Sequence, residues 1–183
     1  MIRLVSIGNL VLMMVAVGCA AEPLRVPVPA DARMLFWERQ SWEPGGGSSR
    51  LTLWADGRSE VIVAPGDQMR GSYERLRPRE GWTVNRASGG VRFVRDQIYP
   101  EQIAREKFRM AFEAGMHLLE SFPPDYLDGS GTLVGVQIGD DLKQTTIPMF
   151  LDSRQGTPNH MRFLTVAEIL GDFDDHAYDL EQP

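Results

Sequence analysis

An amphipathic segment bounded by prolines, residues 101–122, constrains the fold of this 183-residue chain more than any other feature. Pro100 fits the first turn of a helix, whereas Pro123-Pro124 cannot continue one. At about 100° per residue, the apolar side chains gather on one broad side and charges of both signs occupy the other. The apolar side comprises Ile103, Phe108, Ala111, Phe112, Leu118, Leu119 and Phe122. This pattern predicts a helix that packs on a sheet rather than on a membrane surface.

The region before this segment carries the alternation and turn residues of β-structure. Residues 51–54 and 58–63 flank Ala55-Asp56-Gly57. A three-residue loop with Gly57 in the left-handed conformation keeps the apolar residues of both strands on one face, whereas a two-residue loop would separate them. We therefore favour the three-residue loop. The residues placed on one face are Leu51, Leu53, Val61 and Val63. Further strands are expected at 35–42, and at 82–86 and 91–95 in a hairpin.

The region after the helix predicts two strands, at 132–138 and 143–151, and a short helix near the end. The start of that helix has two alternatives: Thr157-Pro158, or the capping box Thr165-Val-Ala-Glu168 after a strand at 161–164. We favour the later start. The fold class is α+β: an antiparallel β-sheet with one long amphipathic helix packed on it and a short C-terminal helix.

The N-terminus carries the pattern of an export signal. Arg3 supplies a short positive region, and residues 10–17 form an uninterrupted apolar run. This run is too short to cross a bilayer, which takes about 20 residues of helix, but it suits the core of a secretory signal. The following stretch, Ala16-Val17-Gly18-Cys19, resembles the lipobox of bacterial lipoproteins.

The lipobox resemblance implies that residues 1–18 are a lipoprotein signal peptide. It also implies that Cys19, the only cysteine, becomes the first residue of the mature protein and carries acyl chains such as palmitate. Several acyl chains together hold a protein firmly on a membrane. Ala20, rather than aspartate, follows the cysteine, which implies the periplasmic face of the outer membrane. An ordinary cleaved signal peptide is the alternative.

The rest of the chain divides into a tether and one domain. Residues 19–33 contain three prolines and no helical or strand period, which is typical of a semi-rigid tether. Residues 34–183 have the length of a single domain and end in an acidic tail.

Charge is unevenly distributed along this domain. Residues 70–95 hold seven arginines and two glutamates, whereas residues 125–183 hold eleven acidic residues and three basic ones. Either the two regions face each other in the fold, or the arginines bind anionic lipid headgroups, acidic glycans or a protein partner in the envelope. We favour the first interpretation. The ligand-binding candidates under the second are Arg75, Arg77, Arg79 and Trp82. A pI near 5.1 argues against nucleic acid as a partner.

No arrangement of residues identifies catalytic groups or a cofactor, and we expect neither. Both Gly-x-Ser-x-Gly and His-Glu-x-x-His are absent from the sequence. We interpret His117 as a residue at the edge of the apolar face, hydrogen-bonded to a neighbouring carboxylate. The metal-binding candidates are Asp172, Asp174, Asp175 and His176, although their spacing fits no calcium loop.

The sequence thus predicts an envelope lipoprotein with a small noncatalytic binding or assembly domain. Two alternatives stay open. One is a glycan- or peptidoglycan-binding module that uses arginine and tryptophan, which would require exposed tryptophan rings. The other is a metal-dependent hydrolase of unrecognised type that uses the acidic loops.

Overall fold

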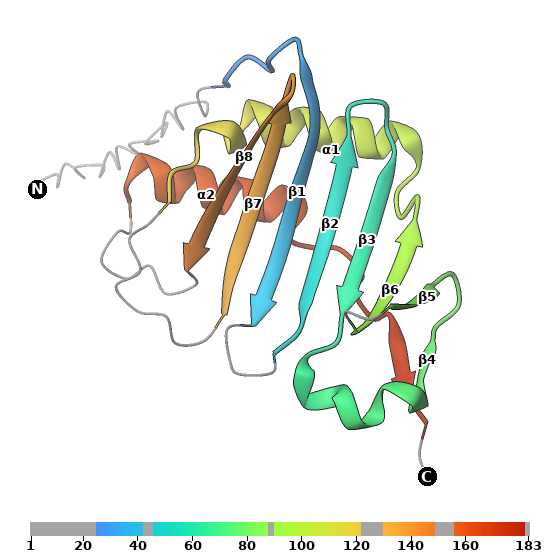
Figure 1. Cartoon of the computed structure of the whole chain (residues 1–183). Helices are drawn as coiled ribbons and strands as arrows, with labels where there is room; N and C mark the ends of the chain where they lie inside the picture. The colour runs from blue at the N-terminus through green and yellow to red at the C-terminus, as the bar shows by residue number, and fades with distance from the viewer. Residues whose placement is uncertain (1–24, 42–45, 88–89, 122–129, 149–155, 182–183) are drawn as a thin grey trace, which may run out of the picture.

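The computed structural model of the chain describes residues 25–41, 46–87, 90–121, 130–148 and 156–181. Within these ranges, seven strands form one antiparallel sheet in the order β5-β6-β3-β2-β1-β7-β8 (Figure 1). The strands are β1 (Ala32–Ser41), β2 (Ser48–Trp54), β3 (Ser59–Ala64), β5 (Thr83–Ala87), β6 (Gly90–Asp96), β7 (Ser130–Ile138) and β8 (Asp141–Pro148). Helices α1 (Glu101–Glu113) and α2 (Pro158–Leu170) cover one face of this sheet. The predicted α+β class is confirmed.

The β2–β3 hairpin has the predicted register. Leu51 lies opposite Val61, and Leu53 lies opposite Ser59. Gly57 has a φ of 92°, in the region that favours glycine, and a Cβ there would lie 2.4 Å from Cγ of Glu101. Glycine at position 57 of the three-residue loop is therefore favoured both by backbone conformation and by space.

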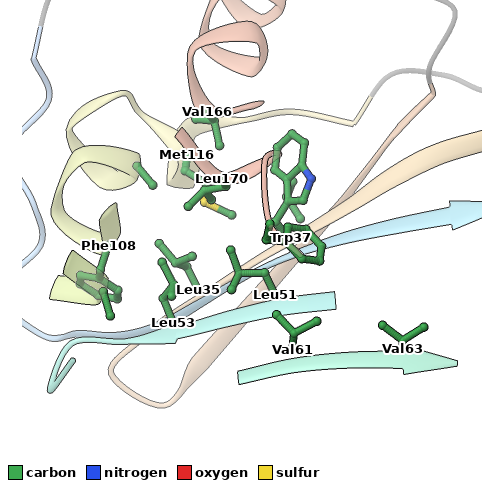
Figure 2. Packing of buried hydrophobic residues seen from close by; sticks show 14 of the residues in the cluster. Leu35, Trp37, Leu51, Leu53, Val61, Val63, Phe108, Met116, Val166 and Leu170 are labelled. Atoms are coloured by element: carbon green, nitrogen blue, oxygen red, sulfur yellow. The ribbon is translucent and has the colours of Figure 1, made fainter. Parts of the chain in front are cut away.

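The hydrophobic core lies between the sheet and the helices. Leu35, Leu51 and Leu53 of the sheet have no exposed surface, and Phe108 of α1 packs in the same cluster. Figure 2 shows these side chains converging with those of α2. The buried residues of α1 are Ala104, Phe108, Ala111 and Phe112. Three of these were predicted to lie on the apolar side.

The first helix is shorter than the predicted 101–122. It ends at Glu113 because Gly115 adopts a φ of 83° and breaks the α-helical hydrogen bonding. A single 3₁₀ turn, η2 (Met116–Leu118), follows. The change of direction leaves Leu118 38% exposed, although the helical pattern had placed it in the core.

The second helix begins earlier than we favoured. The Thr157 side chain accepts a hydrogen bond from the backbone N–H of His160 at 3.2 Å, and Pro158 occupies the first turn. Thr165 lies inside the helix and donates its hydroxyl to the carbonyl of Met161 at 3.0 Å. It therefore does not cap a later helix, and the expected strand at 161–164 is wrong.

The C-terminal strap, residues 171–181, runs from α2 across the helix-covered side of the sheet (Figure 1). Phe173 and Ala177 of the strap are buried. Its last part is β9 (Tyr178–Leu180), which pairs antiparallel with β4 (Leu76–Pro78). In the chain, β4 directly follows the 3₁₀ helix η1 (Asp67–Arg75). The acidic end of the chain is therefore a packed part of the domain.

Within the described residues, no helix is long and apolar enough to cross a membrane.

Candidate binding pocket

The helix-covered face of the sheet changes from apolar to polar toward one end. Trp37 of β1 lies opposite Leu51 of β2 on one side and opposite Val134 of β7 on the other. Two residues further along β1, Arg39 lies opposite Ser49 of β2 and Thr132 of β7, and these three residues form a polar row across the sheet. Because side chains two residues apart in a strand share a face, this polar row faces the same side as the core.

A pocket of about 740 Å³ opens above this polar row. The sheet supplies Trp37, Arg39 and Thr132 to its wall, and the strap supplies Asp175 and Tyr178. Its volume falls within the range of about 300–1,000 Å³ that is common for small-molecule sites. The pocket therefore exists because the strap crosses the end of the sheet without filling it.

Arg39 fastens the strap to the sheet. One terminal nitrogen donates to Oδ2 of Asp175 at 2.8 Å and to the carbonyl of Phe173 at 3.3 Å. The guanidinium carbon also lies 4.3 Å from the centre of the Phe173 ring. The ion pair is partly shielded from solvent, with side-chain exposures of 42% for Arg39 and 32% for Asp175. The positive charge of Arg39 is thus largely balanced.

Within the part of the chain that the structure describes, two N–H donors on residues that line the pocket have no acceptor. They are Nε1 of Trp37 and Nε of Arg39, both buried. The Trp37 side chain is held by stacking on Phe163, with ring centres 5.4 Å apart. Figure 2 shows its indole nitrogen on the side toward the C-terminal end of β1, where the pocket lies. Buried N–H groups without an acceptor are uncommon in proteins, and both of these atoms are shielded from solvent.

The Arg-rich region and the acidic strap face each other, as we favoured. Arg77 pairs with Glu181 at 2.7 Å and Arg79 pairs with Asp179 at 3.0 Å. Arg75 donates instead to the hydroxyl of Ser72 at 3.1 Å. The ligand-binding candidates Arg77 and Arg79 are therefore engaged within the domain.

The four metal-binding candidates do not converge. Asp174 pairs with Arg95 at 3.0 Å, and Asp175 pairs with Arg39. The backbone N–H of His176 donates to Oδ1 of Asp174 at 3.0 Å, while Asp172 is exposed. Across the described ranges, no group of three or more His, Cys, Asp or Glu side chains is placed to hold a metal ion.

The described tryptophans do not form an exposed platform. Trp37 and Trp82 are 3% and 6% exposed and belong to the core. Trp54 is half-buried, and the guanidinium of Arg58 lies 4.8 Å from its ring centre. Trp42 and Cys19 lie outside the described residues, and so does the segment 1–18 that was predicted to be a signal peptide.

His117 has a different environment from the one we predicted. Its Nδ1 is buried and has no hydrogen-bond partner among the described residues, and its ring stacks on Phe112 with centres 5.6 Å apart. Burial lowers the pKa of His117 below its ordinary value of 6.5, and the cations Lys143 and Arg162 lower it further. The charged neighbours that affect the titration of His117 are therefore cations and not the carboxylate that we predicted. The reason is that α1 ends at Glu113, so His117 no longer follows the helical pattern.

Acidification is expected to destabilise the protein in part through His117. As the pH falls through about 6.5, the unfolded chain takes up this proton before the folded one does, so the free energy of unfolding decreases. His117→Phe keeps the ring contact but removes the proton site. Between about pH 7.5 and about pH 5.5, the free energy of unfolding measured with urea should therefore fall less in the variant than in the wild type. Identical pH dependences would contradict this assignment.

The main pocket residues were missed from the sequence. Arg39, Ser49 and Thr132 each interrupt the inward-facing apolar positions of a strand, and such an interruption marks polar groups that face a core or a cavity. The signal was present in β1, where Leu35 and Trp37 are followed by Arg39 on the same face. This signal identifies a polar row only once β1 is paired with β2 and β7, and the register of that pairing is not evident from the sequence of β1 alone.

The fold and the pocket together define an α+β domain with an open pocket at one end of its sheet. No family model matches the chain, and neither does any curated protein.

Proposed function

We propose that this protein is a cell-envelope lipoprotein, anchored through acylated Cys19, whose domain binds a small ligand in the pocket beside Arg39 without chemical conversion. The pocket carries the binding part of this proposal, because its volume of about 740 Å³ suits a small molecule. Its charged pair, Arg39 and Asp175, serves to hold the strap, which favours a binding role over proton transfer. The anchoring part rests on the stretch Ala16-Val17-Gly18-Cys19.

The proposed location is the periplasmic face of the outer membrane, with membrane lipid as the partner of Cys19. The residue after the cysteine, Ala20, supports this location. The expected tether of residues 19–33 would be shorter than its predicted bounds, because the Val26 N–H already donates to the carbonyl of Glu113 at 2.9 Å and β1 begins at Ala32. The part of the chain between Cys19 and Val26 would connect the lipid to the domain.

Replacing the anchoring cysteine tests the location. In its own host, Cys19→Ser should abolish incorporation of labelled palmitate and move the protein from the membrane fraction to the soluble fraction, because the acyl chains supply the membrane affinity. Ala21→Ser is the matched control: it makes a substitution of similar size near the anchor and should leave labelling and fractionation unchanged. Retained labelling and membrane association in Cys19→Ser would overturn the lipoprotein proposal.

A further inference from the structure

We propose that the domain itself rests on the phospholipid surface to which the acyl chains of Cys19 attach it, through apolar side chains exposed where α1 ends and α2 begins. The side chains of this helix-end surface are Met110, Leu118, Met161 and Leu164. The inference rests on the proposed anchoring through Cys19 and adds the side of the domain that faces the lipid.

The described chain starts at this end of α1. The backbone N–H of Val26 donates to the carbonyl of Glu113, the last residue of α1, at 2.9 Å, and the guanidinium of Arg25 lies 3.9 Å from the Glu113 carboxylate. Val26 comes seven residues after Cys19, and a fully extended stretch of that length spans no more than about 25 Å. Acyl chains on Cys19 therefore hold the C-terminal end of α1 within that distance of the membrane.

The first half of α2 lies beside this end of α1. The Asn159 side chain accepts from the backbone N–H of Glu120 at 3.1 Å and donates to its carbonyl at 3.0 Å. A Cβ at Gly115 would lie 3.2 Å from Cδ of Arg162. Figure 1 likewise shows α1 ending close to the start of α2. The outward sides of the two helices therefore adjoin at this end.

Exposed apolar side chains gather at this end. Among the described residues, eight large apolar side chains are exposed, and four of them are those of the helix-end surface. Met161 and Leu164 are 54% and 47% exposed and, three residues apart in α2, lie on the same side of that helix. The buried residues Val166 and Leu170 lie on the side that faces the core. The helix is thus apolar on its outward side as well, which is typical of a helix that contacts a partner or a lipid.

The charges around the helix-end surface suit anionic phospholipid head groups. The first two turns of α2 carry Arg162 and no acidic residue. The ammonium of Lys143 lies at η2, where it donates to the His117 carbonyl at 3.0 Å. Glu106 and Glu168, about one turn further along each helix, border the surface. The cations at this end are Arg25, Arg109, Lys143 and Arg162, and the carboxylates are Glu113 and Glu120. This excess of cations attracts an anionic surface.

Methionine oxidation tests this contact without any change in the domain. We would treat the lipoprotein, reconstituted in vesicles of phosphatidylethanolamine and phosphatidylglycerol, with hydrogen peroxide and measure the oxidation rate of each methionine by mass spectrometry. The full chain with Cys19→Ser, which carries no acyl chains, gives the rates in solution. Met110 and Met161 report on the helix-end surface, and Met69 is the control because η1 lies away from both helices (Figure 1).

On vesicles, Met110 and Met161 should be oxidised about tenfold more slowly than in solution, because membrane contact buries apolar side chains about 5–10 Å deep, away from the aqueous oxidant. Met69 should be oxidised at the same rate in both samples. Equal rates for Met161 in the two samples, with the acylated protein bound to the vesicles, would overturn the membrane contact and leave the anchor standing.

Two further outcomes have distinct meanings. A protein purified from its host without acyl chains, or one that does not float with the vesicles, would overturn the anchoring and with it this contact. Slow oxidation of Met161 in the Cys19→Ser protein that speeds up on dilution would show that a second copy covers the helix-end surface, and would overturn lipid as its partner.

A pair of substitutions tests whether the apolar side chains cause the contact. Met161→Ser with Leu164→Ser changes two exposed side chains, so the fold should persist. The acylated variant should still bind vesicles, but Met110 should lose its protection from peroxide. Val84→Ser is the matched control: it removes an exposed apolar side chain of β5, at the sheet edge opposite to β8, and should leave Met110 protected. Unchanged protection of Met110 in the double variant would overturn the role of Met161 and Leu164.

Discussion

Replacement of Phe112 by alanine is expected to lower the free energy of unfolding by about 3–5 kcal/mol. Phe112 has no exposed surface and belongs to the core cluster between α1 and the sheet. Its ring contacts those of Phe108 and His117, with centres 4.9 Å and 5.6 Å apart. Alanine would leave a cavity that the surrounding strands and helices close only in part, so the loss of contacts adds to the loss of buried apolar area. Urea unfolding followed by circular dichroism measures the effect.

Met110 provides the matched control on the same helix. Its side chain is 39% exposed, and alanine is a better helix former than methionine, so Met110→Ala should change the stability by less than about 1 kcal/mol. Equal losses in the two variants would mean that the buried side of α1 has been misassigned.

Replacement of Arg50 by methionine is expected to destabilise the protein by about 2–3 kcal/mol, below the cost of about 3–5 kcal/mol for breaking a fully buried pair. Glu38 lies on the sheet face that the helices leave uncovered, yet its side chain is only 8% exposed. It accepts from Nε of Arg50 at 2.6 Å and from the amide of Gln40 at 2.9 Å. Arg50 also lies over the Phe36 ring, 4.4 Å from its centre, and covers the carboxylate. The variant keeps much of the apolar contact and leaves a shielded carboxylate without its cation.

Arg58→Met is the matched control for this pair. Arg58 and Asp56 have side-chain exposures of 64% and 56%, so their ion pair should contribute no more than about 1 kcal/mol. Adding Glu38→Gln to Arg50→Met should recover part of the lost stability, because a neutral amide costs less to bury than a carboxylate. Two results together would contradict this prediction: equal losses of stability in Arg50→Met and Arg58→Met, and no recovery when Glu38→Gln is added. They would mean that Arg50 does not stabilise the shielded Glu38 carboxylate.

Local features of the fold could be predicted from the sequence. The β2–β3 register depends on Gly57 and on apolar positions within a few residues of it, so one short segment contains the necessary information. The end of α1 was mispredicted because the prolines at 123–124 received more weight than Gly115, whose positive φ ends the helix first. The start of α2 was mispredicted because two capping patterns compete there, and the sequence alone does not show which threonine uses its side chain as a cap.

The candidate site depends on long-range pairing. The charge asymmetry correctly indicated that the arginines would face the acidic end, because opposite charges are numerous in both regions. The pocket itself could not be predicted, since Arg39 and Asp175 are 136 residues apart and meet only through the path of the strap. The polar row at Arg39 likewise becomes evident only after β1 has been paired with two neighbours.

The position of the strap also sets the order in which the domain can form. Residues 171–181 close the pocket by pairing with partners around Arg39 and Arg77, which are synthesised more than 100 residues earlier. Contacts of such wide sequence separation form late, because the intervening chain loses much freedom before they contribute stability. The sheet residues that face the pocket are therefore exposed throughout translation and any translocation of the chain. Only the arrival of residues 171–181 shields them, so the pocket forms together with the contacts of the strap.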